Sequence, residues 1–146
     1  MAVDRAFDLL KLKPLSVTPG EADHRRTFND LRIVAETKGR ETGIKKSDAR
    51  QLEDWVSSEH FGDDDEAEAK GILVGNAWRL TAPEDREAAF SPNVVDYSTP
   101  RGHCLITTVQ LLDIVEDVLE DESRAEAHVK NIMKTSGVYV PLTPKN

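Results

Sequence analysis

The feature that most constrains the fold is a short apolar run bounded by glycines, Gly71-Ile72-Leu73-Val74-Gly75. A continuous run of this length is typical of a β-strand that is buried on both faces, and such a strand needs a covering layer on each side of its sheet. We therefore expect it at the centre of a sheet that helices cover. With 146 residues, the chain has room for one domain with a real core, spanning residues 1–146.

The flanking sequence predicts alternating helices and strands. An amphipathic helix is expected before Pro14, and residues 24–28 and 31–35 are predicted to pair as a hairpin through Asn29-Asp30. Further helices are expected after the N-cap Ser47, near residues 92–98, after the capping box of Thr107 and Gln110, and after a second box of Ser123 and Glu126, stopping near Gly137. Residues 104–106 and 138–140 are predicted strands. This order predicts an α/β fold with helices flanking a mixed sheet.

Several protein classes are disfavoured by composition. No apolar run approaches the length of a membrane span, and the first residues lack the apolar core of a signal peptide, so we expect a cytoplasmic protein. Cys104 is the only cysteine, which excludes internal disulfides and a zinc site built on paired cysteines. We expect its thiol to be buried. The acidic stretch from Glu59 to Lys70 is interpreted as a solvated loop.

The net charge of -8 argues at first against a nucleic-acid partner, but the charges are unevenly distributed. Between Arg25 and Arg50 eight basic residues stand against four acids. A phosphate bound at this segment would feel the local excess more than distant acids, because salt screens exposed charges beyond about 8 Å. The segment is therefore a candidate phosphate-binding surface, with an ordinary solvated face as the alternative.

Two carboxylates and one ammonium group are expected to meet on the first hairpin. Asp23 precedes one strand, whereas Glu36 and Lys38 end the other, and side chains two positions apart on a strand point to the same side. Mg²⁺ binds one or two protein carboxylates and completes its shell with water and substrate phosphate. Asp23 and Glu36 could hold such a metal, while Lys38 could orient or help deprotonate the attacking water.

This pattern resembles the D…(D/E)-x-K signature of the PD-(D/E)XK, restriction-endonuclease-like nuclease superfamily. Glu36-Thr37-Lys38 supplies the tripeptide, and Gln51 with Trp55 is similar to the Gln-x-x-x-Tyr element of RecB-type domains, here with tryptophan in place of tyrosine. The later segments, residues 70–76 and 102–110, also resemble those of RecB-type and Mrr-type domains. Ala22 stands where the signature has proline.

The resemblance implies a three-layer sandwich fold. It also implies a nuclease that depends on Mg²⁺ or Mn²⁺ and acts on DNA more often than on RNA. It implies Asp23, Glu36 and the Thr37 carbonyl as metal ligands, with Lys38 as the catalytic lysine and Gln51 as its support. Phosphate contacts are expected from Arg25, Arg26, Arg40, Lys45, Lys46 and Arg50. A second copy of the chain, or a larger parent protein, is the further partner that we expect.

Two other interpretations stay open. The domain could keep the nuclease fold and serve as a nucleic-acid-binding or regulatory module, an option that its negative charge favours. A small Rossmann-like binding protein ranks last, because the run from Gly71 to Gly75 lacks the glycine spacing that holds a dinucleotide pyrophosphate. His24, next to Asp23, is expected to point away from the metal, and the other histidines have no ligand-like spacing.

Overall fold

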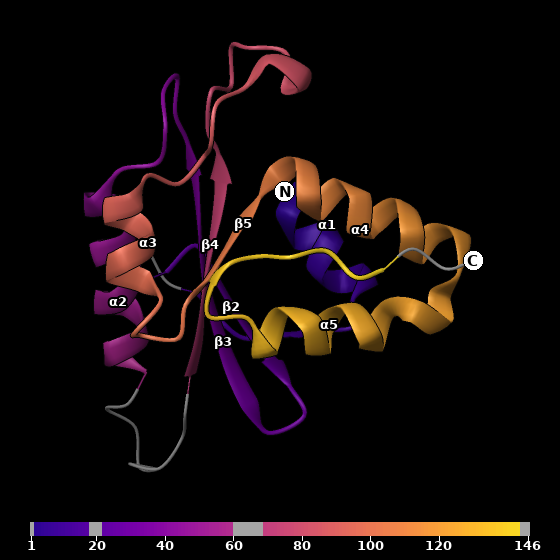
Figure 1. Ribbon diagram of the computed structural model, residues 1–146. Coiled ribbons are helices and arrows are strands. Elements are labelled where there is room, and N and C mark those ends of the chain that lie inside the picture. The colour runs from indigo at the N-terminus through magenta and orange to yellow at the C-terminus, as the bar shows by residue number, and fades with distance from the viewer. Residues whose placement is uncertain (1, 18–21, 60–68, 144–146) are drawn as a thin grey trace.

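A computed structural model describes residues 2–17, 22–59 and 69–143 of the chain. Its elements form three layers, with a sheet between two layers of helices (Figure 1). The layer on one face holds α2 (Lys46–Ser58) and α3 (Pro92–Ser98), and the layer on the other holds α1 (Ala2–Leu9), α4 (Thr108–Glu120) and α5 (Ala125–Lys134). The predicted α/β class and its covering helices are confirmed.

The described part of the chain contributes six strands, which lie in the sheet in their sequence order. They are β1 (Lys13–Pro14), β2 (His24–Phe28), β3 (Leu31–Gly39), β4 (Ala69–Asn76), β5 (Cys104–Thr107) and β6 (Gly137–Val138). The first three strands pair antiparallel, and β3 to β6 pair parallel. The apolar run of the sequence forms β4, which lies between β3 and β5 and so confirms the predicted central strand.

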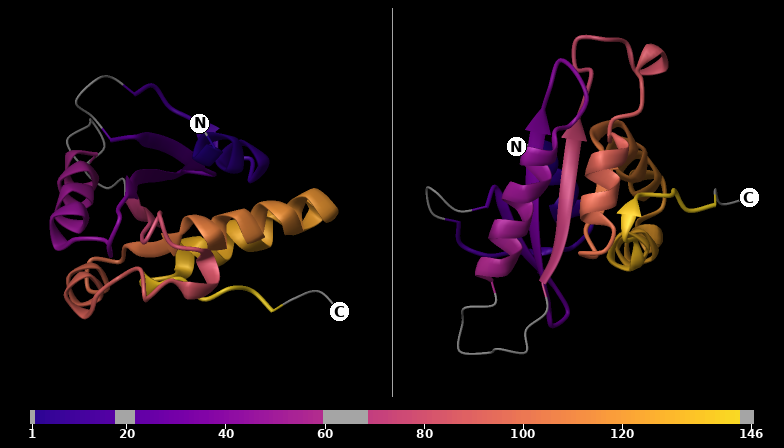
Figure 2. Two further views of the ribbon diagram at one scale, coloured as in Figure 1. Left: turned by 90° about the horizontal axis from the view of Figure 1, so that it is seen from above. Right: turned by 60° about the vertical axis from the view of Figure 1, so that its left-hand side comes forward.

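Two apolar cores lie on the two faces of the sheet. Ile33 and Ala35 of β3 pack in the core under α1, α4 and α5, whereas Val34 between them packs in the core under α2 and α3. Because side chains alternate along a strand, Glu36 and Lys38 belong to the α2 side. Figure 2 shows α2 running along this face of the sheet, so the residues of its first turns can reach the end of β3.

Some predicted boundaries are wrong. β3 continues to Gly39 instead of ending at residue 35, because β4 pairs with it from Arg32 to Gly39. β1 was not expected; it adds to the sheet beside β2. Lys70 belongs to β4 and not to the acidic loop, whereas residues 60–68 of that loop, with His60, lie outside the described residues.

The capping pattern predicted for α4 is present, whereas those predicted for α2 and α5 are not. The box of Thr107 and Gln110 is present at α4, where the Gln110 backbone N–H donates to Thr107 Oγ1 at 3.1 Å. Ser47 does not cap α2, which begins at Lys46. The second box is wrong as well: Asp121 accepts the Ser123 N–H at 3.1 Å, a 3₁₀ turn (Glu122–Arg124) follows, and α5 begins only at Ala125. No helix among the described residues is long and apolar enough to cross a membrane.

Candidate functional site

The hairpin of β2 and β3 brings Asp23 opposite Glu36. His24 pairs with Ala35 in this antiparallel ladder, so the next residue outward on each strand faces the other. The Asp23 N–H donates to Glu36 Oε1 at 2.9 Å, and the Thr37 N–H donates to Asp23 Oδ2 at 3.0 Å. These two hydrogen bonds hold the two carboxylates next to each other at the edge of the α2 face.

The two acids differ in their environment. Asp23 is exposed, whereas only 2% of Glu36 is accessible to solvent. The pKa of Glu36 is raised from 4.5 to about 7, chiefly by burial. The hydrogen bond from the Asp23 N–H and the charge of Lys38 oppose the rise, whereas repulsion from the Asp23 carboxylate adds to it. A carboxyl with this pKa is partly protonated at neutral pH, and a cation bound at the pair would favour its ionised form.

Lys38 lies on the same side of the strand, with its Nζ 3.9 Å from Glu36 Oε2. This distance is longer than a hydrogen bond, so the two groups interact chiefly by charge. The three residues expected from the tripeptide and the upstream acid are therefore neighbours.

A fourth residue, Asp48, was missed by the sequence analysis. It lies in the first turn of α2, is 2% exposed, and pairs with Arg40, whose Nη2 lies 2.5 Å from Asp48 Oδ1. Burial is the largest single influence on the pKa of Asp48 and would raise it, but the hydrogen bonds from Arg40 and from the Lys45 backbone, together with the positive charges of Arg40 and Lys38, outweigh burial and lower this pKa. Lys38 therefore lies in the field of both Glu36 and Asp48.

A signal for Asp48 was present in the sequence. Asp48, Leu52 and Val56 follow one another at intervals of four, the spacing of residues that share one face of a helix. All three are buried beneath α2. An acid on the apolar face of the helix that follows the tripeptide could therefore have been placed near the site.

Gln51 lies on a different face of α2. Its side chain is exposed, and no hydrogen bond or ion pair joins it to Lys38 within the described ranges 2–17, 22–59 and 69–143. The predicted support of Lys38 by Gln51 stays a prediction. The Thr37 carbonyl as a metal ligand also stays a prediction.

The expected phosphate contacts fall into two groups. Lys45, Lys46 and Arg50 are exposed at the start of α2, and Lys46 Nζ lies 5.7 Å from the centre of the Tyr97 ring. They form no ion pair with another described residue. These three cations are free to meet an anionic ligand.

The other group consists of arginines that already pair with acids. Arg25 binds Glu59, and Arg40 binds Asp48. Arg26 is 4% exposed and lies on the α1 face, where Nη1 donates to Asp8 Oδ1 at 2.6 Å. The predicted phosphate contact of Arg26 does not fit the structure, because the Arg26 guanidinium is enclosed between β2 and α1.

Three histidines are buried and paired with acids. His24 points to the α1 face as expected, with Nδ1 2.8 Å from Asp4 Oδ1 and Nε2 3.0 Å from Thr37 Oγ1. His103 lies next to Glu53, and His128 lies next to Asp117. Each of these two histidines therefore lies in a buried polar contact.

The donor set at Asp23 and Glu36 suits a hard cation. No group of three or more histidine, cysteine or acidic side chains that could hold a metal occurs in the part of the chain that the structure describes. Mg²⁺ fits, because two carboxylates with water and substrate oxygens can complete its shell.

Comparison with known proteins found no significant match, since no protein-family model, no curated protein and no solved structure is detectably similar to this chain.

Proposed function

We propose that this chain is a metal-dependent nuclease domain of the PD-(D/E)XK type, which hydrolyses phosphodiester bonds of DNA in preference to RNA. The observation that carries the proposal is the meeting of Asp23, Glu36 and Lys38 on one hairpin, with one acid exposed and the other buried. The order of elements around them, in which a hairpin is followed by α2 and then by β4 of a mixed sheet, is consistent with a restriction-endonuclease-like fold.

Each residue has a role that its surroundings favour. Asp23 and Glu36 would hold Mg²⁺ or Mn²⁺, and the metal, once bound, supplies a Lewis acid that polarises the phosphodiester and activates water. Lys38 would orient the attacking water and offset charge that develops on the phosphate. The ion pair of Arg40 with Asp48 neutralises the second buried acid, so Lys38 keeps its interaction with Glu36.

Substrate would approach over the start of α2. Lys45, Lys46 and Arg50 are exposed there, and phosphate contacts from such cations position a nucleic acid without reading its sequence. The proposed substrate surface is thus smaller than the basic segment suggests, because Arg26 is enclosed and Arg25 and Arg40 are paired.

The decisive experiment is a nuclease assay on single-stranded and double-stranded DNA and RNA, with Mg²⁺ or Mn²⁺ and with a chelator. Asp23→Asn and Lys38→Ala should each lower the cleavage rate at least about a hundredfold, because each removes a charge at the reacting phosphate. Asp30→Asn, at the exposed turn of the same hairpin, and Lys130→Ala on α5 are the matched controls and should cleave normally. An unchanged rate in either site variant would refute the assignment.

The alternative is a nuclease-like fold that only binds or regulates, which the net charge of -8 favours. Calorimetric titration with Mn²⁺ separates the two. The nuclease proposal predicts saturable binding that Asp23→Asn abolishes and Asp30→Asn preserves. A pure interaction module has no reason to bind a metal at this pair, so absent binding together with absent cleavage would select it.

A further inference from the structure

Helix α4 carries an apolar stripe on its solvent side. Leu112 is 56% exposed and Leu119 is 67% exposed, although both are large aliphatic side chains. With the half-buried Val115 they follow one another at intervals of three and four residues, the spacing of one stripe along a helix. Single exposed leucines are ordinary, but a continuous apolar stripe indicates a surface that another molecule covers.

The stripe borders a groove of about 160 Å³ between α4 and α1, which pack against each other. Apart from Arg5 and Thr108, every side chain that lines the groove is apolar. The groove and the stripe together form one apolar surface, the α1–α4 surface, made by Val3, Leu9, Leu112, Val115 and Leu119. The proposed nuclease mechanism uses none of these residues.

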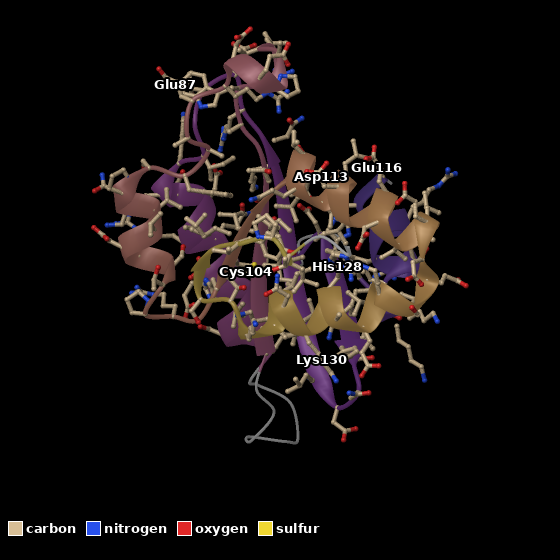
Figure 3. All side chains as sticks on the ribbon, turned by 45° about the vertical axis from the view of Figure 1, so that its right-hand side comes forward. Glu87, Cys104, Asp113, Glu116, His128 and Lys130 are labelled. Atoms are coloured by element: carbon tan, nitrogen blue, oxygen red, sulfur yellow. The ribbon has the colours of Figure 1, made fainter. Side chains whose placement is uncertain are left out.

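The two rims of the α1–α4 surface carry opposite charges. Arg5 lies on the α1 side, where it lines the groove. Glu116 lies on the other side, because at 3.6 residues per turn Leu112 falls between Val115 and Glu116 around α4. Figure 3 shows Glu116 on α4, on the side away from α5. Arg5 and Glu116 are exposed, and neither forms an ion pair with another residue that the structure describes.

Charge complementarity identifies the molecule that covers this surface. A partner of one uniform charge would meet one rim of its own sign, whereas a second copy of the chain offers the same apolar stripe with both signs. If a two-fold axis runs along α4, Arg5 of each copy faces Glu116 of the other. Leu112 and Leu119 then each meet their own counterparts, as in a parallel pair of helices.

We propose that the α1–α4 surface is the interface of a homodimer in which the two copies of α4 run parallel. The apolar stripe supplies most of the binding free energy, and the exposed rim charges select the orientation, because an antiparallel pair places like charges opposite each other. The surface is small, so we expect a dissociation constant of about 1 to 100 µM. The dimer does not depend on the nuclease activity, since α1 and α4 lie on the opposite face of the sheet from α2.

Sedimentation equilibrium of the full chain at about 5 to 500 µM tests the dimer, and the natural chain should change from monomer to dimer over this range. Leu119→Asp should weaken the association at least about tenfold, because it brings two carboxylates together in the apolar centre. Leu80→Asp is the matched control, since Leu80 is 72% exposed on the segment after β4, and this variant should dimerise normally. Both variants change exposed side chains and should melt close to the natural chain.

Exchange of the rim charges tests the pairing. Arg5→Glu and Glu116→Arg should each weaken the dimer several-fold, because each places like charges opposite each other, and the double variant should recover to within about twofold of the natural chain. The two changes shift the net charge in opposite directions, so a loss in both cannot come from overall repulsion.

Three outcomes would overturn the proposal. A chain that stays monomeric up to about 500 µM would leave the surface to a different protein. A Leu80→Asp variant that dissociates as readily as Leu119→Asp would place the interface elsewhere. Single charge variants that associate like the natural chain, or a double variant that stays as weak as they are, would exclude the pairing of Arg5 with Glu116.

Discussion

Glu36 is the residue whose surroundings differ most from those of an ordinary surface acid. It is buried at the edge of the α2 core, it accepts a backbone hydrogen bond from Asp23, and its pKa rises to about 7 because burial disfavours its charge. In the unfolded chain the same carboxyl should titrate at an ordinary value near 4.5. Between these two values the folded protein binds more protons at this group than the unfolded protein does.

This difference makes a prediction for stability in a metal-free buffer. As the pH rises from about 4.5 to about 7, the free energy of unfolding should fall, because the folded state must give up a proton that it holds more tightly. The loss due to this group should reach roughly 3 kcal/mol at most. Urea unfolding at several pH values would measure it.

Glu36→Gln is the control for that prediction, since an amide of the same shape does not titrate. The variant should lose less stability than the natural chain over the same pH interval. Identical pH profiles for the two proteins would show that Glu36 titrates at its ordinary pKa in the folded protein.

At the scale of single elements, α4 shows how a local pattern can determine a helix start. Thr107 ends β5 and also caps α4, so strand and helix follow each other without a loop. The Thr107 N–H donates to Gln110 Oε1 at 3.0 Å, which completes the reciprocal box. The start of α5 lacks such a box, because its N-cap residue Arg124 makes no side-chain cap and Asp121 caps the preceding 3₁₀ turn instead.

We therefore expect Thr107→Ala to cost about 1 kcal/mol of stability, the usual loss when a capping hydroxyl is removed. Ser123→Ala should cost clearly less, since the Ser123 hydroxyl is exposed and donates to Asp121 instead of capping a helix. Urea unfolding of both variants would compare the two costs. An equal loss would mean that the two helix starts are stabilised alike.

At the scale of the whole molecule, three exposed cations at the start of α2 stand out on an acidic chain. The net charge is -8, yet the start of α2 presents Lys45, Lys46 and Arg50 to solvent beside the candidate site. A nucleic acid would therefore bind through a small cationic surface on an acidic protein. Its affinity should fall steeply with salt, because each phosphate contact releases counterions.

Reversing these three charges to glutamate should weaken DNA binding and should reduce the slope of log affinity against log salt by about 2 to 3. Fluorescence anisotropy over a salt series would measure both effects. Reversing Lys130 and Lys134 on α5 is the matched control, because these exposed cations lie in the layer on the other face of the sheet. Equal losses for the two sets would contradict a substrate surface on α2.

The sequence alone determined the features that depend on neighbours along the chain. The glycine-bounded run predicts β4, the residues after β5 predict the cap of α4, and the spacing of Asp23, Glu36 and Lys38 around a tight turn predicts that they meet. Each depends on strand alternation, hairpin register or a first-turn hydrogen bond, which act over a few residues. Such local rules can be applied before the fold is known.

Only the tertiary structure decided features that arise from contacts between distant segments. Pairing with β4 extends β3 to Gly39, and packing against α1 encloses Arg26. A cavity lined by Gln110, His128 and Tyr139 forms only where α4, α5 and the C-terminal segment come together. Burial and charge pairing depend on which residues surround a group in space, so no local pattern could show that the Arg26 guanidinium is enclosed and paired with Asp8.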